Sequence, residues 1–308
     1  MYTLEKYSSL KSRYTCPSCN ERHQFTRYVN IETNEQLAES VGICNRINSC
    51  GYHVTPKQYF QDNPNLYTLD KKCIQPKKIV YTSPSFIPQE YVHKSLYTNQ
   101  RNALNYFILY LESLVGCIKA KELIMQFQIG TSKHWPGSTI FWQIDASGNT
   151  RTGKIMLYNP ETGKRIKEPF SHIYWVHSKL LKENIVNTYC LQQCIFGLHQ
   201  LYTASKTKTI GIVESEKSAI IASALLPELI WMATGGIQNL SSKMLTPLSN
   251  RKLILFPDLN ACTLWEEKVN KIKQELNINI CISFLLEQKA SATDRAKGFD
   301  LADYLIKA

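Results

Sequence analysis

The sequence lacks any apolar run long enough to cross a membrane. Its most apolar helix-like stretch, Tyr106–Val115, is short and contains Glu112, whereas a membrane-spanning helix needs about 20 apolar residues. The first ten residues show no basic segment followed by an apolar one, so we expect no secretory leader. Gly153-Lys154 and Gly163-Lys164 do not complete the phosphate-loop pattern G-x-x-x-x-G-K-[ST]. We therefore expect neither a membrane partner nor a built-in ATP motor.

Acidic residues are scarce relative to basic ones. The chain carries 36 Lys and Arg against 25 Asp and Glu, a formal net charge of +11. The excess is concentrated in residues 91–205, with 12 basic and 6 acidic side chains, while residues 206–308 are nearly balanced, with 13 and 11. A basic chain favours a polyanionic partner. We expect the middle segment to bind nucleic acid, and the alternative is an inert basic surface.

Four of the ten cysteines have the spacing of a metal site. The pattern is Cys16-x2-Cys19, 24 further residues, and Cys44-x5-Cys50. Without a leader, such pairs indicate a reducing, cytoplasmic compartment and a metal rather than disulfides. A tight Cys-Pro-x-Cys turn aims two thiolates at one point, which suits tetrahedral zinc. We predict a structural Zn²⁺ ribbon over residues 1–62, with His23 or His53 as alternatives for one ligand.

The same N-terminal segment interleaves aromatic and cationic residues, which either stack on single-stranded bases or pack in a small core. Arg27 is our candidate there for nucleic-acid contact. Residues 63–97 are rich in proline and lysine with little periodicity, and we interpret them as a linker.

Residues 98–205 are predicted to form a basic α+β domain. Helical spacing runs through Thr98–Gly116 and Lys119–Gln128, and Leu191–Tyr202 is predicted to be a helix as well. Between them, Ser138–Asp145 and Thr150–Tyr158 flank a Ser-Gly-Asn turn and predict a hairpin. Cations on or just after this hairpin are either contacts to phosphates or ordinary surface charges; they are Arg151, Lys154, Lys164 and Arg165.

Residues 206–308 alternate strands with helices, which predicts a mostly parallel sheet with flanking helices. The expected strands are 209–213, 229–233, 252–256 and 278–284. The carboxyl ends of parallel strands meet at one edge, where open α/β sheets bind their ligands. Polar residues or glycines follow the first three strands, and we expect them to converge there; they are Glu214, Gly235, Gly236, Asp258 and Asn260.

These segments resemble a known family. IVESEKSA, ATGG, LFPDLNA and GFDLADYL are similar to the Toprim domain of topoisomerases and bacterial-type primases. The preceding cysteine pattern and the segment IFWQIDASGNTRTGKIMLYN follow the order of parts in bacterial DNA primase. In their detailed amino-acid sequence, these segments are most similar to primase-like proteins of phages and mobile elements.

The resemblance implies Mg²⁺- or Mn²⁺-dependent nucleotidyl transfer, with Glu214 as general base or metal ligand. Asp258, together with Asp300 or Asp303, would hold the metal, which prefers carboxylate oxygen. Asn260 stands where the family has a second acid, and could offer only an uncharged oxygen. Lys217 is either a phosphate contact or the charge partner of Glu214 or Glu216. Asp300 and Asp303 are alternatively a helix N-cap and a first-turn acid.

The expected function is template-dependent synthesis of short RNA primers by a DNA primase. The expected partners are a single-stranded DNA template, ribonucleotides and a separate replicative helicase. One alternative is a non-catalytic, single-stranded-DNA-binding replication accessory with a degenerate Toprim domain. A Toprim nuclease ranks last, because it gives no reason for the zinc ribbon.

Overall fold

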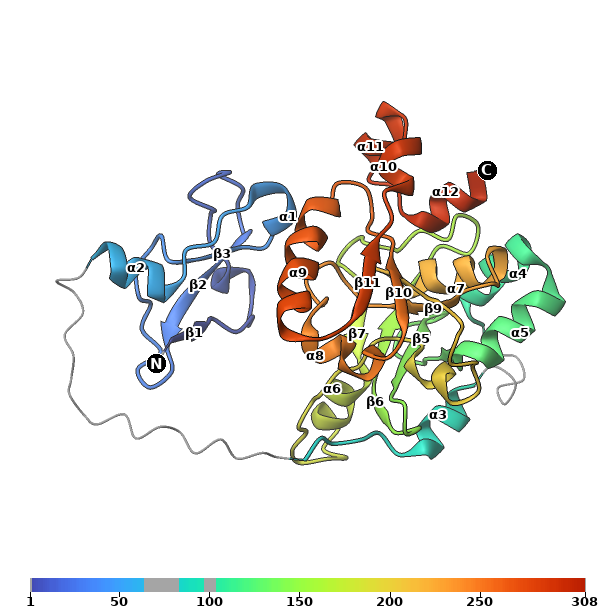
Figure 1. Cartoon of the computed structure of the whole chain (residues 1–308). Coiled ribbons are helices and arrows are strands. Elements are labelled where there is room, and N and C mark those ends of the chain that lie inside the picture. The colour runs from blue at the N-terminus through green and yellow to red at the C-terminus, as the bar shows by residue number, and fades with distance from the viewer. Residues whose placement is uncertain (1, 64–82, 97–103, 308) are drawn as a thin grey trace. The chain divides into compact units, whose positions relative to one another are not determined.

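The chain folds into two compact units. The computed structural model describes residues 2–63, 83–96 and 104–307, and its units are Met1–Val80 and Tyr81–Ala308 (Figure 1). The predicted linker, residues 63–97, lies largely outside the described residues. Its described end carries a short helix, α3 (Gln89–Ser95). Among the described helices, none combines the length and the apolar character that crossing a membrane requires.

The first unit is a three-stranded antiparallel sheet in the order β1-β2-β3. Its strands are β1 (Tyr2–Leu4), β2 (Phe25–Asn30) and β3 (Gly42–Cys44), and its helices are α1 (Ile47–Cys50) and α2 (Pro56–Asp62). Thr55 and Gln58 cap α2 reciprocally, and Pro56 occupies its first turn. The buried core around the cysteines is small, with Phe25 as its one large apolar residue among the described ones.

The second unit begins with a four-stranded antiparallel sheet in the order β4-β5-β6-β7. The predicted hairpin is β5–β6, and Asp145 stabilises its turn by accepting the backbone N–H groups of Ser147 and Asn149. The strands are β4 (Gly130–Thr131), β5 (Thr139–Ile144), β6 (Thr150–Met156) and β7 (Ile173–Trp175). The accompanying helices are α4 (Tyr106–Val115), α5 (Cys117–Phe127) and α6 (Val176–Lys182).

The helix predicted over Leu191–Tyr202 is wrong. Only a short 3₁₀ turn, η4 (Leu198–Tyr202), forms there. The backbone of Phe196 instead pairs with Ala233 at the sheet, and Gly197 adopts a φ of +85° that ends the extended segment. Pairing with a strand distant in sequence overrides the local helical pattern.

The second sheet is parallel, in the order β11-β10-β8-β9. This confirms the α/β fold class predicted for residues 206–308. From β9 the chain crosses over to the far side of β8 to form β10, so the direction of winding reverses at β8. The strands are β8 (Ile210–Val213), β9 (Ile230–Ala233), β10 (Lys252–Leu255) and β11 (Asn279–Ile282). The helices are α7 (Glu216–Leu225), α8 (Ser242–Leu245), α9 (Cys262–Glu275), α10 (Leu285–Lys289), α11 (Ala292–Lys297) and α12 (Leu301–Lys307).

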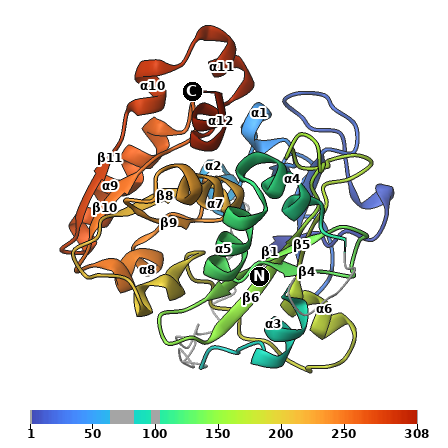
Figure 2. The same cartoon turned by 90° about the vertical axis from the view of Figure 1, so that its right-hand side faces the viewer.

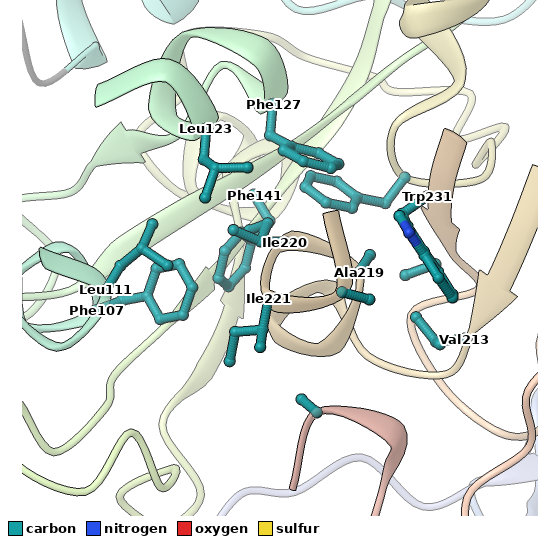
Figure 3. Close-up of a cluster of buried hydrophobic side chains, with 14 of the residues drawn as sticks. Phe107, Leu111, Leu123, Phe127, Phe141, Val213, Ala219, Ile220, Ile221 and Trp231 are labelled. Carbon is teal, nitrogen blue, oxygen red and sulfur yellow. The ribbon is translucent and has the colours of Figure 1, made fainter. Parts of the chain in front are cut away.

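The two sheets of the second unit share a hydrophobic core. Ile220 and Ile221 of α7 belong to one buried cluster with Leu123 and Phe127 of α5 and Phe141 of β5 (Figure 3). Figure 2 shows α5 beside α7. The stacked rings of Phe127 and Phe196, 5.4 Å apart, tighten this contact. The shared core holds the basic hairpin in a defined position relative to the parallel sheet.

Candidate functional site

A cavity of about 660 Å³ opens at the carboxyl ends of β8 and β10. Crevices at a topological switch point are where open α/β sheets place their ligands. Both sheets contribute to its walls. The predicted site residues that line it are Lys154, Lys164, Arg165, Glu214, Lys217, Asp258, Asp300 and Asp303, together with Gly235 and Gly236.

Glu214 and Asp258 form the buried acidic centre of this cavity. Each follows a strand of the parallel sheet, and the Asp258 backbone N–H donates to Glu214 Oε1 over 3.4 Å. Burial raises the pKa of Glu214 to about 7, with a further contribution from Asp300. Burial and the neighbouring Glu214 carboxylate also raise the pKa of Asp258 well above its usual range. A positive charge close to both carboxylates would therefore stabilise their ionised forms.

Asp300 and Asp303 approach from α12 and fill two roles at once. Asp300 Oδ1 accepts the backbone N–H of Asp303 (2.8 Å), and Asp303 Oδ2 accepts that of Asp300 (3.3 Å), so the pair caps the helix. The other carboxylate oxygen of Asp300 accepts the hydroxyl of Ser218 (2.7 Å). Both acids line the cavity. The two interpretations of these residues, helix cap and site residue, are therefore compatible.

Lys217 lies 3.9 Å from Asp300 and 3.7 Å from Asp303. Of the two alternatives for Lys217, the charge pairing with Glu214 or Glu216 is wrong, and contact with phosphate stays a prediction. Successive residues of a helix point about 100° apart, so Lys217 faces α12 while Glu216 faces β6. The lysine partly neutralises the carboxylates at the α12 end of the cavity.

Glu216 is a buried residue whose partner the sequence analysis missed. Lys154 of β6 contacts both carboxylate oxygens of Glu216, at 3.2 and 3.1 Å, and donates to the carbonyl of Gly235 over 2.9 Å. The side chains are only 9% and 2% exposed. A Cβ on Gly235 would lie 3.1 Å from Glu216, and its φ of +77° favours glycine. The only sequence signal was a second glutamate two residues after Glu214.

Three predicted site residues lie outside the lining of the cavity. The Asn260 side-chain amide donates to the carbonyl of Arg295 (3.2 Å). Arg151 pairs with Asp145 (2.8 Å) and covers the ring of Phe86. In the first unit, Arg27 stacks over Tyr14 at 4.0 Å. Lys164 and Arg165 line the cavity with exposed side chains, and Lys167 joins them.

One oxygen of the acidic centre, Asp258 Oδ1, is buried, and no hydrogen-bond donor reaches it from the described parts of the chain. A buried carboxylate oxygen without a donor is costly, and a bound Mg²⁺ or Mn²⁺ would satisfy it. Asp258, Glu214 and Asp300 offer the oxygen ligands that such ions prefer.

In the first unit, the four predicted cysteines come together. Their sulfur atoms all lie within 4.8 Å of one another, and the Cys16–Cys50 and Cys19–Cys44 distances are 3.7 and 4.0 Å. Tetrahedral zinc with Zn–S bonds of about 2.3 Å requires sulfur atoms roughly 3.8 Å apart. His23 and His53 contact Arg13 and Tyr28 instead. The four cysteines therefore form a group that could hold a metal ion without a histidine.

Replacing one of these cysteines should remove zinc and unfold the first unit. We expect Cys50→Ser to reduce bound zinc from about one ion per chain to well below that, and to make residues before 63 sensitive to protease, because the small core depends on the metal. Metal analysis and limited proteolysis measure both effects. The control Cys117→Ser, an exposed thiol, should retain zinc; equal zinc in both variants would contradict the assignment.

The raised pKa of Glu214 predicts a pH-dependent cost of folding. Its folded pKa of about 7 exceeds the usual 4.5, so the folded state binds more protons between these values and stability falls as pH rises. Without added divalent metal, the free energy of unfolding of Glu214→Gln should rise relative to that of wild type as pH increases from 4.5 to 8. The increase should be at most roughly 3 kcal/mol. All five tryptophans lie after residue 130, so their fluorescence during denaturant unfolding measures this. A difference independent of pH would contradict the prediction, and Glu228→Gln is the control.

Removing Lys154 should leave Glu216 buried and unpaired. We expect Lys154→Met to lower the free energy of unfolding by about 3–5 kcal/mol, and the double variant Lys154→Met/Glu216→Gln to recover much of it. Lys271→Met breaks an exposed pair with Glu275 and should cost less than about 1 kcal/mol. Denaturant unfolding followed by tryptophan fluorescence compares the three. A double variant as unstable as the single one would rule out the unpaired charge as the cause.

Comparisons with known proteins find similar sequences and similar solved structures. A family model for a zinc β-ribbon finger matches residues 1–65, and no curated protein matches the chain. Among solved structures, the chain is similar to the DnaG primase catalytic domain bound to ssDNA (11% identity, 71% of this chain and 80% of that chain, TM-score 0.45). It is also similar to the primase fragment of the bacteriophage T7 primase-helicase (11%, 93% and 98%, TM-score 0.38). A third match is the Aquifex aeolicus primase, zinc-binding and RNA polymerase domains (13%, 99% and 80%, TM-score 0.39).

A second family model, that of the domain of unknown function DUF6371, matches residues 105–259. Because this match covers half of the 308 residues, the chain belongs to the DUF6371 family.

Proposed function

We propose that this protein is a DNA primase-like nucleotidyltransferase that makes short RNA primers on single-stranded DNA. The observation that carries the proposal is the composition of the 660 Å³ cavity, whose lining combines six carboxylates with five cations. Phosphoryl transfer needs this combination, because a divalent metal must be held while phosphate charge is neutralised. The motif resemblance to primases supports the same assignment.

Asp258 is the proposed principal metal ligand, with Asp300 and Asp303 completing the site. A bound Mg²⁺ or Mn²⁺ would supply positive charge for the nucleotide phosphates and polarise the attacking hydroxyl. Glu214 lies within hydrogen-bond distance of the Asp258 backbone, and its pKa of about 7 suits a group that accepts a proton from a primer 3′-hydroxyl near neutral pH.

The cations divide into structural and substrate-facing groups. Lys154 is committed to Glu216, so its proposed role is to position α7 and the Gly235 backbone. Lys164, Arg165 and Lys167 line the cavity with exposed side chains, and we assign them the triphosphate of the incoming ribonucleotide. Lys217, between Asp300 and Asp303, would exchange partners when phosphate enters.

A second candidate, the non-catalytic DNA-binding accessory, is favoured by one observation. Asn260 lies outside the cavity lining and contacts Arg295, so this position supplies no charge to a second metal. The first candidate accounts better for Asp258, whose buried Oδ1 has no hydrogen-bond donor among the described residues and would be satisfied by a bound metal ion.

The zinc ribbon and the basic hairpin would bring template to this site. Single-stranded DNA is the proposed template, and a separate replicative helicase is the proposed further partner, in the cytoplasm of a bacterial or phage-infected cell. Arg27, held over Tyr14, is a candidate contact to template bases in the ribbon.

The direct test is primer synthesis. With single-stranded DNA, labelled ribonucleotides and Mg²⁺ or Mn²⁺, the wild type should produce short oligonucleotides resolved on a denaturing gel. Glu214→Gln and Asp258→Asn should each reduce the yield by roughly 100-fold or more, because each removes a group that acts on the reacting atoms. Glu228→Gln, an exposed carboxylate between α7 and β9, should remain active.

Absence of product with every template and both metals would refute the primase proposal. Salt-sensitive binding of single-stranded DNA that is indifferent to Glu214 and Asp258 would then favour the accessory.

A further inference from the structure

A ladder of five rings lies on the antiparallel sheet of the second unit, outside the cavity. Phe170 stacks on His172 (4.4 Å between ring centres), which meets the edge of Trp135 (5.1 Å). Trp135 in turn contacts His134 (4.3 Å), and His134 stacks on Tyr174 with an interplanar angle of 5°. The rings come from the β4–β5 loop, from the segment before β7 and from β7 itself, which is an edge strand. Their alignment is therefore a product of the tertiary fold.

The inner rings are held rigidly. Trp135 and Tyr174 pack against the buried cluster beneath the sheet. The loop that carries His134 is closed by hydrogen bonds from the His134 N–H to Ser132 Oγ (3.0 Å) and from Ser138 Oγ to the Trp135 carbonyl (2.8 Å). His172 Nδ1 donates to the carbonyl of Ile166 (3.2 Å). Rings positioned in advance lose little freedom when a ligand stacks on them.

The outer end of the ladder is exposed. Phe170 is 53% exposed, although burying a phenylalanine side chain would stabilise the protein by roughly 1.5–3 kcal/mol. Its one ring contact of stacked geometry within the described residues is with His172. A flat, exposed ring at the end of a cluster of stacked and edge-on rings suits a planar ligand.

The surroundings of the ladder are basic. Three exposed lysines accompany the ladder. Lys133 precedes His134 and Lys167 precedes Phe170 in the sequence, and the third is Lys182. Lys179 and Lys182 are close enough that their charges, after burial, lower the pKa of His134. Glu183 also acts on His134, and it pairs with Lys179 (3.8 Å). The balance favours a polyanion.

The ladder is connected along the chain to the wall of the acidic cavity. Lys167 and Glu168 line that cavity, and Phe170 follows two residues later. The segment that carries the exposed end of the ladder therefore also contributes to the cavity wall.

We propose that the ladder formed by Phe170, His172, Trp135, His134 and Tyr174 is a stacking platform for the bases of single-stranded nucleic acid. Aromatic rings bind successive bases with little sequence preference, while adjacent lysines contact the phosphates. The inference deepens the proposed function, on which it rests for the identity of the ligand, but binding to the ladder requires no catalysis.

The test separates stacking from phosphate binding. Fluorescence anisotropy compares a labelled oligo-dT with an abasic strand of the same length, using the full-length wild type, Phe170→Ala, Phe170→Tyr and Tyr202→Ala. Tyr202 is 87% exposed but lies apart from the ladder, which makes it a matched control. We expect Phe170→Ala to weaken oligo-dT binding roughly tenfold and to leave abasic binding unchanged. Phe170→Tyr and Tyr202→Ala should match wild type.

Three outcomes would overturn the platform. They are equal affinity of wild type and Phe170→Ala for oligo-dT, an equal loss for both strands, and an equal loss in Tyr202→Ala. Because the measurement is of binding, an inactive protein that shows the expected pattern would refute primer synthesis and retain the platform. A protein that makes primers but lacks the expected binding pattern would refute the platform and retain primer synthesis.

Discussion

The site depends on the packing of α7 against α5 and β5. This helix begins directly after the tip of β8, so its buried face determines where Glu214, Glu216 and Lys217 are placed. Ile220 and Ile221 are fully buried in a cluster that also holds Phe127 and Phe141. Close-packed cores tolerate little displacement. The same contact that stabilises the second unit therefore holds the acids of one sheet facing the cations of the other.

Charge is distributed unequally within the cavity. Lys154 and Glu216 are paired deep in the wall, and Lys217 is shared between Asp300 and Asp303. Glu214 and Asp258 form no ion pair with a lysine or arginine among the described residues. Burial raises the pKa of both acids, and the more distant Lys217 only partly offsets this for Asp258. A positive charge beside the two carboxylates would lower both pKa values. Burying these two acids lowers the stability of the fold, which is common at functional sites.

Much of this arrangement could be predicted from the order of residues. The strands after residue 205 are short apolar runs ending in polar residues or glycine, and parallel strands bring such ends to one edge. That reasoning located Glu214, Asp258 and Gly235 correctly around one cavity. The two cysteine pairs, Cys16-x2-Cys19 and Cys44-x5-Cys50, were likewise identified from their spacing, and all four cluster. The helix expected over Leu191–Tyr202 failed because the backbone of Phe196 pairs with Ala233, a partner that no local pattern reveals.

By itself, the sequence determined which chemical groups are available and on which local elements they lie, because hydrophobic periodicity and ligand spacing are local properties. Only the tertiary structure decided their partners. Lys154 and Glu216 lie 62 residues apart, and nothing local indicates that one neutralises the other. Asn260 follows Asp258 by two residues, yet a φ of +71° and the Arg295 carbonyl turn it away from the cavity. Contacts between distant segments depend on how helices and sheets pack, and packing is settled by the whole core rather than by any one stretch of sequence.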